Sequence, residues 1–181
     1  MYSAITPYLV PDNLPKKVNI GDGFIMDSSI KLIQKKPEFV FSSRVSLTDE
    51  DIEKINTTKS LIVMGANTLK DNYEITPNFN LEILKKINVP IILMGVGHYG
   101  VESVTNNGLD TNSLNLLEEI TNRFPFISVR CNYSYNYLKR SNINEQNILN
   151  TSCPVIYSID EVNKQFSKSN QKVVVTITDR I

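Results

Sequence analysis

Short, unbroken apolar runs recur along this chain at a spacing that few folds accommodate. They lie at Leu61–Met64, Ile91–Met94 and Phe126–Val129, and their starts are 30 and 35 residues apart. A run without polar alternation is typical of a strand whose two faces are both covered. Segments with helical spacing separate the runs, as at Ser113–Arg123. This period is typical of right-handed β-α-β crossovers, so we predict a doubly wound, mostly parallel α/β sheet.

The flanking sequence predicts further elements of the same sheet. Ser3–Val10 is expected to hold a first strand, which Pro7 and Pro11 limit to an edge position or a short piece. Further strands are expected at Glu38–Ser42, Ile148–Leu149 and Val155–Tyr157. Helices are expected at Phe24–Ile33, Leu81–Ile87 and Asn132–Arg140. A capping box at Thr48–Asp51 predicts one more short helix, which ends at Ile55.

Composition excludes several classes of protein. The chain has 181 residues, 41% apolar and 21% charged, which suits one domain with a single core. Its net charge is zero and its Lys and Arg are scattered, so the electrostatic footprint of a nucleic-acid-binding protein is missing. Met1–Ile5 carries no secretory signal, and no apolar run is long enough to cross a bilayer. We therefore expect a cytoplasmic protein.

Metal chemistry is also not expected. Cys131 and Cys153 form no C-x-x-C pair, and His98 is the single histidine. A zinc site needs more ligands of these types, and two isolated cysteines without a signal peptide are expected to be reduced thiols.

A glycine-rich strand end is the first candidate for a ligand site. Gly95, Gly97 and Gly100 follow the apolar run Ile91–Met94 and enclose His98. In open α/β sheets the ligand crevice lies outside the carboxyl ends of the strands, and glycine lets the backbone approach a ligand. His98 titrates near neutral pH, so it is a candidate acid or base. The alternative is a glycine-rich loop with a solvated imidazole.

A glycine loop that enters a helix and one further strand end also carry polar side chains. Asn19–Gly23 precedes the predicted helix Phe24–Ile33, where free backbone N–H groups suit an anion. Asp22 would suit a sugar hydroxyl better than a bare phosphate, or it would simply cap the helix. Arg130 directly follows the run Phe126–Val129, where its guanidinium can point into the crevice. The alternative is a surface Arg paired with a carboxylate on a helix.

Taken in order, these residues resemble the polysaccharide pyruvyl transferase family, from about Asn19 to about Thr178. The resemblance begins with an N-x-G-D loop at Asn19–Asp22 and two strand ends with small residues, at Leu61–Asn67 and Gly95–Gly97. A V-R-x-x-x-S segment at Ile127–Arg130 with Ser134, and a C-P pair at Cys153-Pro154, follow in the same order. No single motif is specific alone, but their order and spacing together are.

The resemblance implies a transferase that moves the pyruvyl group of phosphoenolpyruvate onto two hydroxyls of a cell-surface polysaccharide. A ketal and free phosphate result, with phosphoenolpyruvate as donor and no cofactor. Arg130 matches the arginine of the family motif and would hold the donor. The family's catalytic histidine belongs to a second lobe, so the acid or base role of His98 rests on its place among the glycines of this sequence and not on the resemblance. Asn19 and Asp22, with Asn67 and Tyr99 as weaker candidates, would hold acceptor hydroxyls. The other residues expected to line the substrate site are Gly21, Gly65, Gly95, Gly97 and Ser134.

Two departures from the family pattern matter. The Asp that follows the Arg in the family is Cys131 here, which puts the orientation of Arg130 in doubt. The family also has two Rossmann-like lobes, similar to GT-B glycosyltransferases, and this chain resembles the first lobe alone. We therefore expect residues 1–167 to form that lobe, and residues 168–181 to hold a linker and the first strand of a second lobe.

Other readings of the function stay open at this point. The chain could be a non-catalytic sugar-binding module, or half of a GT-B-like glycosyltransferase that uses a nucleotide sugar. The sequence does not settle whether this half is active alone, or whether it forms a homo-oligomer.

Overall fold

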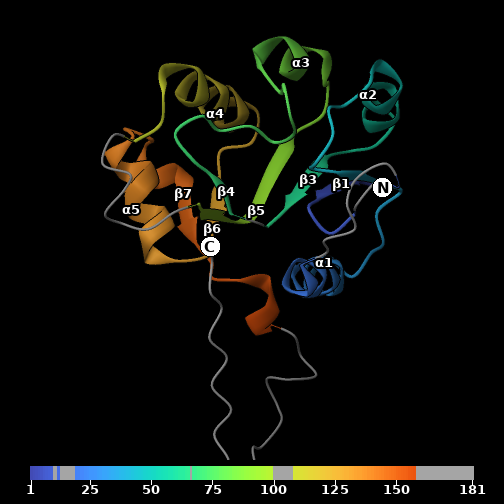
Figure 1. Ribbon diagram of the computed structural model, residues 1–181, viewed down its shortest axis with the longest axis horizontal. Helices are drawn as coiled ribbons and strands as arrows, with labels where there is room; N and C mark the ends of the chain where they lie inside the picture. The colour runs from blue at the N-terminus through green and yellow to red at the C-terminus, as the bar shows by residue number, and fades with distance from the viewer. Residues whose placement is uncertain (10–11, 13–18, 66, 100–107, 158–181) are drawn as a thin grey trace, which may run out of the picture.

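In the computed structural model, residues 1–9, 12, 19–65, 67–99 and 108–157 are described. Their strands form one parallel sheet in the order β2-β1-β3-β5-β6-β7, and β4 pairs with β5 off this path (Figure 1). The strands are β1 (Ser3–Thr6), β2 (Phe39–Ser42), β3 (Leu61–Met64), β4 (Asn67–Leu69), β5 (Ile91–His98), β6 (Ile127–Val129) and β7 (Ile148–Asn150).

Helices cover both faces of this sheet, as a doubly wound fold requires. The helices are α1 (Ile20–Ile33), α2 (Asp49–Asn56), α3 (Leu81–Lys86), α4 (Thr111–Arg123) and α5 (Asn132–Arg140), with short 3-10 turns η1 (Glu145–Asn147) and η2 (Pro154–Tyr157). Figure 1 shows α2, α3 and α4 on one side of the sheet and α1 on the other. The predicted fold class is therefore confirmed.

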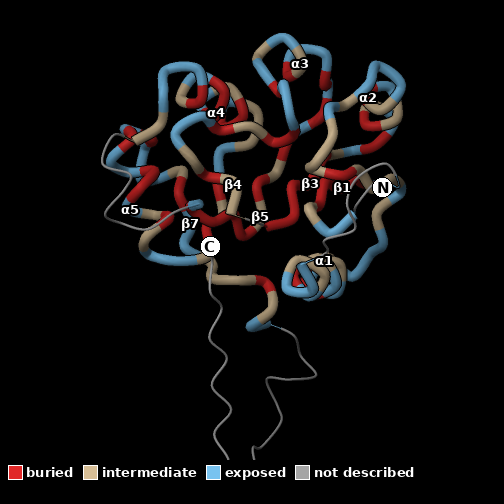
Figure 2. Tube along the Cα trace, viewed as in Figure 1, coloured by how far each residue is buried: buried red, intermediate tan, exposed pale blue. Residues whose placement is uncertain are grey.

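Two apolar layers follow from the strand pattern. Residues such as Leu61, Val63 and Leu93 point toward α2 to α5 and belong to the larger buried cluster. The alternate residues, such as Ile62 and Met64, pack beneath α1 in a smaller cluster. Figure 2 shows the buried residues concentrated in the strands between these layers. None of the helices in the described ranges is long and apolar enough to cross a membrane.

The helix starts depend on side-chain caps. The Asn19 side chain accepts a hydrogen bond from the backbone N–H of Gly21, so α1 begins at Ile20 rather than at the predicted Phe24. Asp22 consequently lies inside the first turn and is not the cap. At α2, Thr48 and Asp51 form the predicted capping box.

Strand β5 is longer than the apolar run that predicts it. It continues through the predicted loop Gly95–His98, and its register against β6 shifts between Leu93 and Val96. Three steps along β5 there face two along β6, so β5 carries a bulge of one residue. Gly95 takes up this bulge with φ of +65°, a conformation that glycine adopts without strain.

The first strand is a short piece, which is one of the two alternatives expected, and it lies between β2 and β3. Val155–Tyr157 belongs to a 3-10 turn instead of a strand, and β4 has no predicted counterpart. The expected linker and strand at residues 168–181, and the lobe boundary at residue 167, lie outside the described residues.

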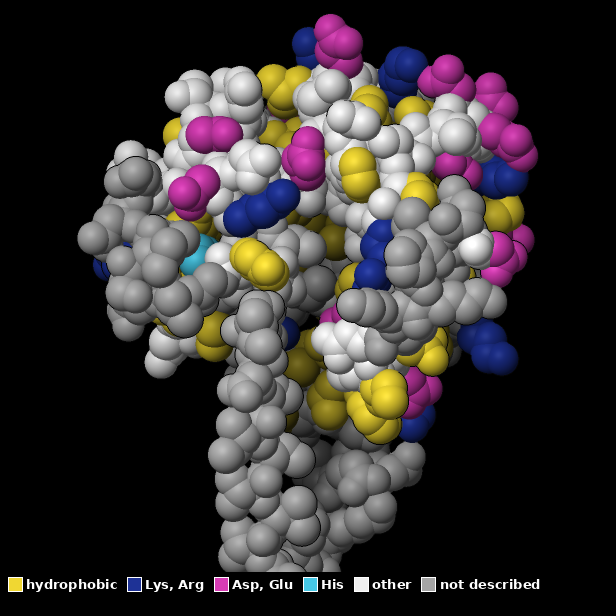
Figure 3. Space-filling view, viewed as in Figure 1, with side chains coloured by type: hydrophobic (Ala, Val, Ile, Leu, Met, Phe, Trp, Pro, Cys, Tyr) yellow, Lys and Arg dark blue, Asp and Glu magenta, His cyan; other side chains and the backbone are white. Residues whose placement is uncertain are grey.

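The strand order reverses between β1 and β3, because the chain moves outward from β1 to β2 and then back across to β3. Crossovers on opposite faces leave a crevice at the carboxyl ends of such a pair. On the face shown in Figure 3, acidic side chains gather toward α2 and apolar side chains toward α1.

Candidate functional site

A hollow of about 370 Å³ lies at the carboxyl ends of the strands, where the reversal of strand order predicts it. We call it the Arg130 hollow. Its lining residues come from the start of α1, from the first residue of β4, from the residue after β6 and from the segment after β7: Asn19, Gly21, Asp22, Phe24, Ile25, Asn67, Arg130, Cys153 and Val155. Four sequence-predicted polar side chains, Asn19, Asp22, Asn67 and Arg130, therefore meet in one place.

The side chain of Arg130 is held along β5. Its Nη2 donates a hydrogen bond to Oδ1 of Asn67, and its backbone N–H donates to the carbonyl of Val96 at 3.1 Å. A Cβ placed on Gly97 would lie 2.8 Å from Cζ of Arg130, closer than any real contact. The guanidinium thus occupies the space that a side chain at position 97 would fill, so Gly97 makes room for it.

Asp22 is the carboxylate of the hollow. Burial raises its pKa, and the positive charges of Arg44 and Arg130 offset part of that effect. A half-buried carboxylate with a raised pKa, next to two guanidinium groups in a cleft, is the kind of group that accepts or donates a proton in catalysis.

The amino end of α1 lines the same hollow, and the dipole of the helix favours negative charge there. The backbone N–H of Asp22 already donates to the carbonyl of Asn19 at 3.0 Å. Asn19 uses its Oδ1 on the N–H of Gly21 at 3.0 Å, which leaves its side-chain NH₂ for a ligand. The hollow therefore combines cationic and N–H donors for an anion with one carboxylate that suits a hydroxyl.

Gly65 and Gly95 support the hollow from beneath and do not line it. The N–H of Gly65 donates to the carbonyl of Met94 at 2.9 Å, and a Cβ there would lie 2.9 Å from the Gly95 carbonyl. A Cβ on Gly95 would lie 2.7 Å from Cδ of Pro154. Both glycines permit close packing, and Gly95 lets η2 approach the sheet.

His98 and Ser134 are not among the lining residues of the Arg130 hollow. The His98 side chain is 6% exposed, and its ring centroid lies 4.2 Å from that of Tyr137 and 4.9 Å from that of Tyr133. Ser134 is fully buried, and its Oγ accepts a hydrogen bond from the N–H of His98 at 2.9 Å. This bond ties α5 to the end of β5. The acid-base role of His98 stays a prediction.

Tyr99 lies in a neighbouring hollow, which we call the Tyr99 hollow. Its volume is about 430 Å³, and its lining residues are Ser43, Asn67, Thr68, Lys70, Glu74, Ile75 and Tyr99. The Tyr99 side chain is 62% exposed. Because Asn67 lines both hollows, the Tyr99 hollow adjoins the Arg130 hollow.

Comparison with known proteins decides the family. A family model described as "Polysaccharide pyruvyl transferase" matches residues 19–180. The chain belongs to this family. A search among curated proteins found no match, and a search among solved structures found none either. Membership in the polysaccharide pyruvyl transferase family implies a transferase that binds a donor and a sugar acceptor.

At the position where the family pattern has an Asp, this pyruvyl transferase-family chain exposes a thiol at the cap of α5. Burial alone would raise the pKa of Cys131, but hydrogen bonds from Ser134 and Tyr133 and the charge of Arg130 outweigh it, so its pKa lies below the usual value. Arg130 is oriented by Asn67 instead of a neighbouring carboxylate.

Sequence reasoning missed Arg44, Cys153 and Val155. Arg44 follows β2 and donates from Nε to the carbonyl of Pro7 at 3.0 Å, and its charge acts on Asp22. The carboxyl ends of parallel strands share one edge, so a cation two residues after a predicted strand was an available signal. After β7, Cys153 entered only through the C-P pair of the family resemblance, and no local signal placed it or Val155 at the hollow, because their position depends on how η2 packs against α1.

Proposed function

We propose that this chain takes part in the transfer of the pyruvyl group of phosphoenolpyruvate onto a sugar of a cell-surface polysaccharide. The observation that carries the proposal is the convergence of Arg130, Asn67 and Asp22 in one hollow at the amino end of α1. This arrangement suits a small anion and a hydroxyl side by side, which a nucleotide-sugar site does not require. The donor is a small phosphorylated metabolite, so the proposal places the protein in the cytoplasm.

The proposed reaction forms two C–O bonds and breaks one. Protonation of the methylene carbon of phosphoenolpyruvate gives a methyl group and positive character at the neighbouring carbon. Two sugar hydroxyls add to that carbon, and the bond to the phosphate oxygen breaks. One hydroxyl proton balances the proton on the methyl carbon and the other leaves on the phosphate. No oxidant, reductant or cofactor is needed.

Arg130 is proposed to hold the carboxylate or phosphate of the donor. A guanidinium binds such anions with two parallel charge-assisted hydrogen bonds, and Asn67 fixes its plane. The dipole of α1, whose amino end lines the hollow, would favour the same anion. Arg44 contributes positive charge nearby.

Asp22 is proposed to accept the proton of an attacking hydroxyl. Its raised pKa brings its basicity closer to working pH than that of a solvated Asp, which improves a general base. Asn19 lines the same hollow, and its NH₂ would orient the sugar.

We further propose that a second lobe closes the Arg130 hollow during catalysis. Phe24 lies at its rim with 60% of its side chain exposed, and Ile20 beside it is also exposed. Apolar side chains at the mouth of a polar site suit a surface that covers it and excludes water.

The test is glycan-dependent turnover. The protein, together with any second lobe, is incubated with phosphoenolpyruvate and isolated cell-surface polysaccharide, and released phosphate is compared with pyruvate gained by the glycan as an acid-labile ketal. The two amounts are expected to be equal, and Arg130→Ala should lower the rate by about 100-fold or more. Arg140→Ala, at the exposed end of α5, is the control. Phosphate release without glycan, or no ketal, would contradict the proposal.

A further inference from the structure

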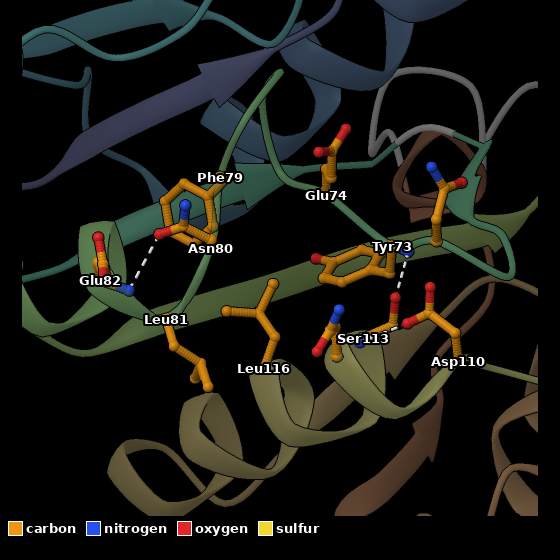
Figure 4. A pocket seen from close by; sticks show the side chains of 11 residues that line it. Tyr73, Glu74, Phe79, Asn80, Leu81, Glu82, Asp110, Ser113 and Leu116 are labelled. Carbon is orange, nitrogen blue, oxygen red and sulfur yellow. Dashed lines mark hydrogen bonds between the residues drawn. The ribbon is translucent and has the colours of Figure 1, made fainter.

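A third hollow lies beyond the Tyr99 hollow, between the segment 72–82 and the start of α4 (Figure 4). We call it the Tyr73 pocket. Its volume is about 420 Å³, which falls in the range of small-molecule sites. Leu81, Leu116 and the buried Phe79 supply apolar surface, and the remaining lining residues are polar or aromatic. The pocket is therefore amphipathic.

The hydroxyl of Tyr73 is the feature of this pocket that points to a ligand. The Tyr73 side chain is 2% exposed, and its hydroxyl has no hydrogen-bond partner among the described residues. Figure 4 shows its ring reaching across toward Phe79 and Leu116, among the other lining side chains. A buried hydroxyl without a partner costs free energy, so a ligand hydroxyl that displaces a lining side chain and reaches it would supply the bond it lacks.

The charges around the pocket select the ligand. Glu74, Glu82 and Asp110 line it, and none of the described lining residues is Lys or Arg. An anionic ligand such as phosphoenolpyruvate would be repelled. No group of three or more His, Cys, Asp or Glu side chains in the described ranges is placed to hold a metal ion. A neutral ligand with several hydroxyl donors fits this lining.

Amides complete the match to a sugar. Asn72, Asn80 and Asn112 line the pocket. Oδ1 of Asn80 already accepts from the N–H of Glu82 at 2.9 Å, so its NH₂ is the group left for a ligand. A pyranose presents hydroxyls at its rim and a patch of C–H groups on its face, and these pair with the polar rim and the apolar surface.

Each of the three hollows shares a lining residue with the next. Glu74 lines both the Tyr73 pocket and the Tyr99 hollow, and Asn67 lines both the Tyr99 hollow and the Arg130 hollow. Tyr99 exposes its ring in the middle of this series, where a sugar face can stack. A path of this kind suits a ligand made of linked units better than a single small molecule.

We propose that the Tyr73 pocket is a distal subsite that binds one sugar of a neutral oligosaccharide chain whose modified end lies in the Arg130 hollow. The identity of that end rests on the proposed function. The binding of the distal sugar rests on the Tyr73 pocket itself.

The test measures how affinity depends on glycan length. Defined neutral oligosaccharides of two to six sugars, in gluco, galacto and manno series, are screened against the full chain by saturation-transfer NMR. At least one series is expected to bind at least fivefold more tightly at four sugars or more than at two. Tyr73→Phe should remove this length advantage, and Glu74→Gln should reduce it. The proposal is overturned if no series binds, or if Tyr73→Phe keeps the advantage.

Tyr2→Phe is the matched control. The hydroxyl of Tyr2 donates to the carbonyl of Lys35 at 2.8 Å, and Tyr2 packs in the cluster beneath α1, on the other face of the sheet. Tyr73→Phe removes an unpaired buried hydroxyl and should raise Tm by about 2–4 °C, whereas Tyr2→Phe should lower it. Higher stability together with weaker glycan binding excludes misfolding as the cause.

The outcomes separate this inference from the proposed function. Length-dependent glycan binding without turnover of phosphoenolpyruvate would leave the subsite standing and refute the proposed function. If the protein turns over phosphoenolpyruvate and Tyr73→Phe does not change the KM for long acceptors, the subsite is refuted and the proposed function stands.

Discussion

At the scale of single residues, the position of Arg130 depends on a residue without a side chain. Gly97 leaves the surface of β5 open, so the guanidinium lies flat along the strand and reaches Asn67. The atoms that a Cβ at this position would meet belong to flexible side chains rather than to backbone. The site is therefore more sensitive to this position than the fold is.

Gly97→Ala is expected to fold and to lose activity. The added methyl displaces the guanidinium of Arg130 by a fraction of an ångström to an ångström, and a misplacement of that size can cost about 100-fold in rate. The measurement is kcat/KM for glycan-dependent phosphate release, with a thermal melt of the same sample. Gly65→Ala is the contrast, because its methyl would meet the backbone carbonyl of Gly95, and it should melt at lower temperature. Wild-type kcat/KM in Gly97→Ala would refute this account of the glycine.

Asp22 should link pH to both stability and rate. Its pKa is raised above 3.8 by burial, so the folded protein holds this proton at higher pH than the unfolded chain does. Stability is therefore lost as pH rises between 3.8 and the raised value, and the loss persists at neutral pH. Asp22→Asn should melt above wild type at pH 7, and the difference should vanish below pH 3.8.

The ionisation of Asp22 should raise the rate with pH, whereas it lowers the stability. A general base must be ionised, so wild-type kcat/KM should fall as pH drops through the raised pKa of Asp22. Asp22→Asn should be inactive at every pH. An active Asp22→Asn enzyme with the wild-type pH profile would show that another group accepts the proton.

At the scale of elements, the bulge in β5 connects the sheet to the segment after β7. Gly95 takes the positive φ of the bulge and donates its N–H to Oγ of Ser128 at 2.9 Å. The same residue leaves space for Pro154, so η2 packs against α1 and brings Cys153 and Val155 to the Arg130 hollow. One irregular residue thus shapes one wall of the site.

Gly95→Ala should damage both stability and activity. The positive φ and the approach of Pro154 together are expected to cost about 1–3 kcal/mol in the free energy of unfolding, measured by urea titration. Gly108→Ala is the matched control, because Gly108 also has positive φ, at +70°, but lies before α4. Both variants should lose stability. When turnover is compared per folded molecule, only Gly95→Ala should show a loss. Equal turnover in the two would contradict this role of the bulge.

The elements that sequence predicted best are those decided by local patterns. Apolar periodicity predicted α5 with its observed bounds, and the capping box at Thr48 predicted the start of α2. The bulge at Gly95 and the turn η2 were missed, because both follow from packing between segments distant in sequence. Local pattern does not carry that information.

The same division holds for the site. Arg130 and Asn67 were predicted from strand ends, because parallel strands bring their carboxyl ends to one edge, and Asp22 was predicted from the glycine loop that enters α1. The surroundings of His98 and Ser134 were not foreseen, since burial against Tyr137 depends on how α5 docks on β5. The Tyr73 pocket left no sequence motif, because its lining comes from a loop and two helices.

At the scale of the whole molecule, the three hollows adjoin one another through shared lining residues. The Arg130 hollow pairs a guanidinium with the carboxylate of Asp22, whereas the Tyr73 pocket is lined by carboxylates and by no Lys or Arg among the described residues. The Tyr73 pocket therefore disfavours an anionic donor, which Arg130 attracts. The strand order, which reverses between β1 and β3, creates the edge at which the Arg130 hollow lies.

Direct binding of phosphoenolpyruvate tests the central claim. Isothermal titration calorimetry on the full protein should give dissociation constants for phosphoenolpyruvate that agree within twofold between wild type and Arg140→Ala. Arg130→Ala should weaken binding by about 10- to 100-fold, because it removes charge-assisted hydrogen bonds to the donor anion. If phosphoenolpyruvate binds Arg130→Ala as tightly as wild type, the Arg130 hollow is not the donor site.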